Sequence, residues 1–173
     1  MREIALDTET TGLDPKSGDR IIEIGCVELI NHMPSGKTYQ QYFNPERDMP
    51  AKSFQVHGLS EEFLANYPAF AEIADEFLDF IGDDKLVIHN ADFDIKFINA
   101  ELTRIGFAAL LMGRTIDTIE IARTRYPDAS ASMDDLCHRF GIFNTSQTLH
   151  GALLDASLLA EVYIGLIGAR EPG

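Results

Sequence analysis

The order of strand and helix patterns constrains the fold of this chain more than any other sequence feature. The first part is rich in strand patterns: an apolar strand begins at Arg2, and a β-branched run covers residues 20–30. Residues 36–43 are its expected hairpin partner across a turn at 31–35. The rest of the chain alternates strands with helices. This order predicts an α/β fold with a mixed five-stranded sheet flanked by helices.

The remaining elements follow from apolar periodicity and from helix start and stop residues. They are a helix over 68–81 that ends at Gly82, a strand over 85–89, a helix over 91–106, a strand over 114–118, a helix from Ile119, a helix capped by Ser132 with Asp135, and a final helix over 151–167. The predicted order is therefore three strands, then helix, strand, helix, strand and further helices. This order is typical of one compact mixed sheet.

Length and composition point to a single globular domain. The chain has 173 residues, of which 45% are hydrophobic and 24% are charged. It contains no apolar run of membrane-spanning length and no basic-then-apolar signal pattern, so we expect a cytoplasmic protein that does not bind membranes. Cys26 and Cys137 form no metal-type pair and are expected to be buried.

The formal net charge of −14 restricts how the chain could bind nucleic acid. It argues against a protein that binds a polyanion through a broad basic surface. It leaves open an acidic site that acts on a polyanion through bound cations, because metal ions invert the local charge.

Two acids stand at the end of the first apolar strand, at Asp7 and Glu9. Residues two apart in a strand point to the same face, so the two carboxylates are expected side by side. Two like charges repel, and burying them is costly unless a positive group pairs with them. A pair of this kind is common by chance, so it needs support from elsewhere in the chain.

Two further segments carry unexplained acids. Asp94 lies at the border of the apolar face of the 91–106 helix, where it could also be an ordinary helix-start acid. Asp155 lies in the apolar final helix, where an ion pair with an arginine is an alternative. His150 is five positions earlier, so the two side chains converge only if His150 precedes the helix or lies in a loosened first turn, which Gly151 permits.

Together these residues place four acids and a histidine on elements that could meet at one end of the sheet. No matching cluster of Lys or Arg accompanies them. Carboxylate oxygens without such partners indicate divalent cations, and hard oxygen ligands suit Mg²⁺ or Mn²⁺ better than zinc.

Three motifs in order now carry a family resemblance. They are LDTETTGL at 6–13, HNADFD at 89–94 and LHGALLDA at 149–156, and they resemble the three motifs of the DEDDh (DnaQ-like) 3′→5′ exonucleases, which have a ribonuclease H-like fold. The segments 21–29, 54–64, 70–81 and 132–142 are similar to the proofreading epsilon subunits of bacterial DNA polymerase III. The likeness implies an exonuclease domain over 1–168, with 169–173 as the start of a C-terminal tail whose remainder is absent.

The resemblance also implies roles for individual residues. The metal ligands would be Asp7, Glu9, Asp94 and Asp155, which hold two Mg²⁺ or Mn²⁺ ions with Asp7 between them, and His150 would be the general base. The pocket for the 3′-terminal nucleotide would be formed by Thr10, Gly12, Val56, His57 and Phe93. Asp92 stands where the family has a small residue, and Lys52 stands where an acid is expected.

The implied reaction is hydrolysis of the terminal phosphodiester of DNA, which releases nucleoside 5′-monophosphates. The implied partners are the single-stranded 3′ end of DNA and, through a C-terminal tail, the alpha subunit of DNA polymerase III and other replisome subunits. Two alternatives stay open at this point. One is a stand-alone exoribonuclease of the ribonuclease T or oligoribonuclease type, and the other is a non-catalytic binding module that keeps the fold.

Overall fold

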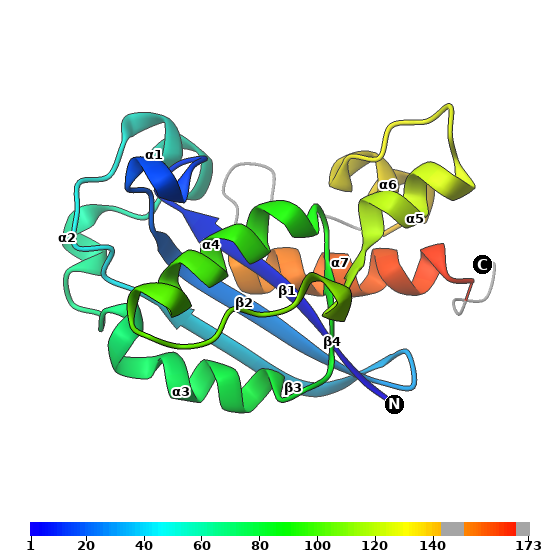
Figure 1. The fold of residues 1–173 in the computed structure, drawn as a ribbon. Helices are drawn as coiled ribbons and strands as arrows, with labels where there is room; N and C mark the ends of the chain where they lie inside the picture. The colour runs from blue at the N-terminus through cyan, green and yellow to red at the C-terminus, as the bar shows by residue number, and fades with distance from the viewer. Residues whose placement is uncertain (143–150, 169–173) are drawn as a thin grey trace.

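The computed structural model describes residues 1–142 and 151–168, and within these residues a mixed five-stranded sheet forms the centre of the molecule (Figure 1). Its strands are β1 (Arg2–Thr10), β2 (Ile21–Ile30), β3 (Met33–Tyr42), β4 (Lys85–Ile88) and β5 (Thr115–Asp117). They lie side by side in the order β3-β2-β1-β4-β5. The first three pair antiparallel, whereas β4 is parallel to both β1 and β5. The predicted sheet is confirmed.

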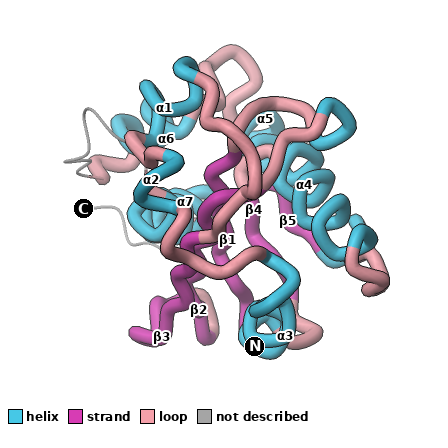
Figure 2. Tube along the Cα trace, turned by 90° about the vertical axis from the view of Figure 1, so that its left-hand side faces the viewer, coloured by secondary structure: helices cyan, strands magenta, loops and turns pink. Residues whose placement is uncertain are grey.

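Helices cover both faces of this sheet. They are α1 (Ala51–His57), α2 (Glu61–Leu64), α3 (Phe70–Ile81), α4 (Ala91–Arg104), α5 (Thr118–Arg125), α6 (Met133–Arg139) and α7 (Ala152–Leu166), with short 3₁₀ turns at Pro15–Ser17 and Met112–Arg114. In two perpendicular views α3 and α4 lie on one face and α7 lies on the other (Figures 1 and 2). Among the described residues, no helix is both long and apolar enough to cross a membrane.

The alternation of side chains along β1 divides the core between these two faces. Ile4 and Leu6 pack into a cluster with residues of α3 and α4. Ala5 points the opposite way and packs with Ala156 and Leu159 of α7. Because residues two apart share a face, Asp7 and Glu9 follow Ala5 onto the α7 side. Core packing thus determines which helix meets the two acids.

The hairpin turn between β2 and β3 is shorter than predicted. It consists of Asn31 and His32, with φ angles of 50° and 67°, and β3 already begins at Met33. Two consecutive residues with positive φ form the type I′ turn, whose twist matches that of the flanking strands. Asn31 tolerates this conformation and also accepts a 2.9 Å hydrogen bond from the N-terminal ammonium. Pro34 fits inside β3 because β3 is an edge strand.

Other element boundaries differ by a few residues. β1 ends at Thr10, with a register shift after Glu9, so the acid pair lies in its last four residues, at the end of the strand as predicted. The α3 helix begins at Phe70, which leaves Pro68 outside its first turn. The predicted cap of α6 is present, since the Ser132 hydroxyl accepts a hydrogen bond from the Asp135 amide.

The sequence patterns did not predict α1 and α2. Both are short, and two apolar residues of α1, Phe54 and Val56, are 45% and 49% exposed. Their exposure means that α1 has no continuous buried stripe, which is the signal that periodicity detects. Pro50 is the N-cap of α1 and has no side-chain oxygen to mark the start of the helix.

Candidate active site

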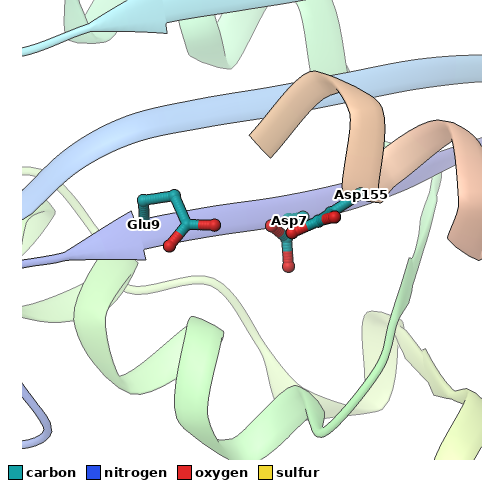
Figure 3. A group of neighbouring side chains, drawn as sticks. All are labelled: Asp7, Glu9 and Asp155. Atoms are coloured by element: carbon teal, nitrogen blue, oxygen red, sulfur yellow. The ribbon is translucent and has the colours of Figure 1, made fainter. Parts of the chain in front are cut away.

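Three of the predicted acids converge between β1 and the first turn of α7. One carboxylate oxygen from each of Asp7, Glu9 and Asp155 lies within 4.8 Å of the others. Figure 3 shows the three carboxyl groups gathered along β1 beside the first turn of α7. A set of oxygen donors with this spacing fits a hard divalent cation such as Mg²⁺ or Mn²⁺.

The electrostatics of this cluster also favour a cation. Burial raises the pKa of Glu9 to about 9, helped by the nearby charges of Asp155, Glu23 and Asp94. Burial raises the pKa of Asp7 well above its usual range, and the carboxylates of Asp94 and Glu9 add to the shift. Without a cation the cluster therefore retains protons at neutral pH. A bound dication would replace them and offset the mutual repulsion.

Asp94 lies next to this group, but it is not one of the three acids whose oxygens lie within 4.8 Å of one another. It is in the first turn of α4, is 4% exposed, and accepts a hydrogen bond from the Thr8 hydroxyl. Burial raises its pKa to about 7, although the Thr8 hydrogen bond lowers it. After burial, the charge of Asp94 is the largest cause of the raised pKa of Asp7, so Asp94 borders the group of three acids from the α4 side.

Asp117 holds the start of α4 in place. Its carboxylate accepts hydrogen bonds of 3.1 Å from the amides of both Asn90 and Ala91, and one of 2.9 Å from the amide of Ile119. It therefore caps α4 and α5 at once and fixes the turn that carries Asp94. Sequence analysis missed this residue, although an aspartate between a strand and a helix is a recognised capping signal.

His150, the predicted general base, lies outside the described residues. The described chain resumes at Gly151, which has an extended backbone and is the N-cap of α7. Asp155 follows in the first turn of that helix. The role of His150 stays a prediction.

A cavity of about 460 Å³ adjoins the acids at the end of β1. All five residues predicted for the nucleotide pocket line it, namely Thr10, Gly12, Val56, His57 and Phe93. Glu9 lines it too, so the cavity opens directly onto the acid cluster. Lys52 also lines the cavity, whereas Thr8, Leu13, Asp19, Pro50 and Ser53 line it without having been predicted.

The wall formed by α1 is attached to the loop after β1. The Ser53 hydroxyl donates a 2.6 Å hydrogen bond to the carbonyl of Thr11. The Thr11 hydroxyl in turn donates to Asp19 at 3.1 Å. A Cβ atom at Gly12 would lie 2.3 Å from Oδ2 of Asp19, so a larger residue here would displace the carboxylate that Thr11 contacts. The cavity therefore has a defined shape before any ligand binds.

His57 forms part of this wall with a defined protonation pattern. It is 5% exposed, and its Nδ1 accepts a 3.0 Å hydrogen bond from the amide of Leu59. Burial lowers the pKa of His57, so the neutral ring is favoured. A neutral ring that accepts at Nδ1 carries its hydrogen at Nε2, which makes His57 a hydrogen-bond donor at that atom.

The site and fold together define a nuclease. A family model described as "Exonuclease" matches residues 4–163, which is nearly the whole chain. The chain therefore belongs to this exonuclease family, as the three motifs predicted.

Individual relatives place the chain more narrowly within the family. DNA polymerase III subunit epsilon of Rickettsia conorii is 52% identical over an alignment of 174 positions, which covers 99% of this chain and 76% of the relative. The corresponding subunit of Escherichia coli K12 is 44% identical over an alignment of 176 positions, which covers 98% of this chain and 72% of the relative. Within the exonucleases, the chain is thus a member of the DNA polymerase III epsilon group.

Solved structures agree with the predicted fold. Exonuclease X in complex with 5′ overhanging duplex DNA has a TM-score of 0.73 and 25% identity, with 98% of this chain and 92% of that chain covered. The nuclease domain of 3′hExo, a DEDDh family member bound to rAMP, has a TM-score of 0.82 at 17% identity, with 97% and 92% covered. The predicted ribonuclease H-like architecture is confirmed.

Proposed function

We propose that this chain is the proofreading 3′→5′ exonuclease of a bacterial DNA polymerase III. It removes 3′-terminal, mispaired nucleotides from DNA as nucleoside 5′-monophosphates. The observation that carries this proposal is the position of Glu9, which belongs both to the acid cluster and to the wall of the adjoining cavity. A terminal nucleotide in the cavity would have its scissile phosphate beside the acids. The high identity to epsilon subunits supports DNA as the substrate.

The residues of the site suit two Mg²⁺ or Mn²⁺ ions. Asp7, Glu9 and Asp155 would hold them, with Asp94 contributing from α4. When bound, such ions would supply positive charge that activates water and stabilises the leaving 3′ oxygen.

The protein side chains perform the remaining tasks. The cavity binds the terminal nucleotide, with the Phe93 ring and the Val56 side chain as apolar surfaces and His57 Nε2 as a hydrogen-bond donor. Lys52 adds a positive charge to the lining of the cavity. His150 takes the proton of the attacking water, since an imidazole titrates near neutral pH.

We also propose that residues 1–168 form the catalytic domain and that the polymerase is contacted outside it. The net charge of −14 makes tight binding of free DNA unfavourable. Attachment to the polymerase alpha subunit would deliver the primer end at a high effective concentration. A weak intrinsic affinity for DNA is therefore compatible with efficient proofreading.

The test is an exonuclease assay on primers with paired and mispaired 3′ ends, with and without Mg²⁺, alongside a short RNA of the same sequence. We expect Mg²⁺-dependent release of nucleoside 5′-monophosphates, faster from the mispaired DNA end. Faster degradation of the RNA would instead support the exoribonuclease alternative. A chain that binds Mn²⁺ in a calorimetric titration but degrades neither substrate would contradict both.

A further inference from the structure

A further buried acid, Glu23 of β2, lies beside the candidate metal site and has no role in the mechanism above. It is 3% exposed and stands directly opposite Glu9 in the β1–β2 ladder. Residues opposite each other in an antiparallel pair project from the same face, so Glu23 points to the α7 side with Glu9. Each of its two carboxylate oxygens accepts a hydrogen bond from the protein.

The first of these hydrogen bonds joins Glu23 to α7. Oε1 of Glu23 accepts a 3.0 Å hydrogen bond from the amide of Ala152, the first residue of that helix. The N-cap of α7 is Gly151, which has no side chain to satisfy this amide. A carboxylate is also favoured by the dipole at a helix start. Glu23 therefore supplies from β2 the cap that α7 lacks.

The second hydrogen bond orients Glu23. Its Oε2 accepts a 2.8 Å bond from Nε2 of Gln40 on β3. Because both oxygens have protein donors, Glu23 is held as a cap and is not offered as a further metal ligand. It stays next to the site, because Glu23 and Glu9 are opposite each other in the ladder.

Gly25 completes the attachment of α7 to the sheet. A Cβ atom at Gly25 would lie 2.4 Å from backbone atoms of Ala152 and Leu153, so the helix backbone rests directly on β2. Gly25 stands opposite Asp7 in the same ladder in which Glu23 stands opposite Glu9. The residues that hold the start of α7 are thus in register with the residues that form the site.

We propose that Glu23 is a positioning residue that, together with Gly25, docks the first turn of α7 so that Asp155 reaches Asp7 and Glu9. Ala152 and Asp155 are three residues apart and lie on the same side of the helix. A helix start that is fixed at Ala152 therefore fixes Asp155. This inference rests on the proposed metal-dependent function, but its test needs no nucleic acid.

The experiment compares the substitutions Glu23→Ala and Glu23→Gln in the full chain. Glutamine keeps an oxygen that accepts from Ala152, and the Gln40 amide can rotate to pair with the new amide. Calorimetric titration with Mn²⁺ measures the affinity of the site, and hydrogen exchange measures protection of the Ala152 amide. Glu28→Ala is the matched control, because Glu28 is a buried acid of the same strand, 6% exposed, that pairs with Arg2 and Ser35.

We expect Glu23→Ala to weaken Mn²⁺ binding by about 10- to 100-fold, as is typical when a residue that orients a ligand is lost. It should also expose the Ala152 amide to exchange, whereas Glu23→Gln and Glu28→Ala should stay close to the wild-type values for both. Wild-type Mn²⁺ affinity in Glu23→Ala would overturn the proposal. So would a Glu23→Gln variant as weak as Glu23→Ala, since the charge and not the cap would then matter.

A second variant tests the docking of α7 without removing Glu23. Gly25→Ala keeps Glu23 but forces α7 away from β2, so it should weaken Mn²⁺ binding while circular dichroism shows an intact fold. Normal Mn²⁺ affinity in a folded Gly25→Ala variant would also overturn the proposal. Failure of the proposed exonuclease function would appear differently, as a wild-type chain that binds Mn²⁺ yet does not hydrolyse DNA.

Discussion

The hydroxyl of Thr8 donates a hydrogen bond to the carboxylate of Asp94, which is 86 residues further along the chain. Thr8 lies between Asp7 and Glu9 on β1, but its side chain points to the opposite face. The strand therefore contacts both layers of helices at the site. Its odd positions meet Asp155 of α7, and its even position holds Asp94 of α4.

Thr8→Val should impair the site without removing any acid. The Thr8 hydrogen bond lowers the pKa of Asp94, so its loss raises that pKa further. Since Asp94 acts in its ionised form, the acidic limb of the rate–pH profile should move to higher pH, with a loss of about tenfold at pH 7. Thr8→Ser, which keeps the hydroxyl, is the control. An unchanged profile for Thr8→Val would contradict the role of this bond.

The stability of the metal-free protein should depend on pH in a defined direction. The folded pKa values of Glu9, about 9, and Asp94, about 7, exceed the values of about 4 expected for unfolded chains. Such acids contribute their full stability below pH 4 to 5 and lose it as pH rises through the folded values. With EDTA present, the melting temperature should therefore decrease as the pH rises from about 5 to about 9.

Adding Mg²⁺ or Mn²⁺ should reverse most of that loss, because binding to the folded state stabilises it. Thermal unfolding at several pH values, with EDTA and with Mn²⁺, checks this pair of expectations. The variant Glu9→Gln should flatten the EDTA curve. A metal-free protein that becomes more stable from pH 5 to pH 9 would disprove the assignment.

Asp7→Ala and Asp94→Ala should each abolish degradation of a 3′-mismatched primer in Mg²⁺. Asp7 belongs to the group of three carboxylates, and Asp94 borders it. Neither loss should unfold the protein, since each removes a buried charge that its neighbours repel. Primer assays with circular dichroism measure both properties. Full activity in either folded variant would refute the metal assignment.

Gly12→Ala should act on substrate binding more than on turnover. A new Cβ would lie 2.3 Å from the Asp19 carboxylate, so this carboxylate, which lines the cavity, must move. We expect KM for a primer to rise about tenfold with a smaller change in kcat. Gly113→Ala is the control, because its Cβ would meet nothing within 4 Å. If both variants had the same KM as the wild type, the cavity would not be the nucleotide pocket.

His150→Ala should lower turnover by about two to four orders of magnitude while DNA binding changes little. The reason is that the imidazole accepts a proton in the reaction and contributes little to holding the strand. Single-turnover kinetics at several pH values, with a separate measurement of DNA affinity, check this expectation. A rate–pH profile identical to that of the wild type would reject His150 as the base.

The sequence predicted the elements that have strong local patterns. The buried β1, β2 and β4 strands, the α3 stripe and the α6 cap were all found, because alternation, helical periodicity and capping residues are local signals. The length of the hairpin turn and the helices α1 and α2 were not found. The turn depends on positive φ at His32, and the α1 helix leaves Phe54 and Val56 exposed.

The site, like the fold, was predicted only in part. Spacing and motif order brought out the acids and the cavity residues, but not the residues that hold them in place. Glu23 accepts from an amide 129 residues away, Thr8 donates to a carboxylate 86 residues away, and Asp117 caps α4 from 26 and 27 residues away. No local pattern predicts these three contacts. Capping across strands and helices becomes visible only in three dimensions.

The late position of α7 in the chain has a consequence for the order of assembly. During synthesis, β1 can pair with β2 almost at once, so Asp7 and Glu9 face each other's charge early. Asp155 and the Ala152 amide that caps on Glu23 follow more than 140 residues later in the chain. A nascent chain that holds only the first two strands therefore lacks Asp155. The group of three carboxylates is complete only once α7 has docked on the sheet.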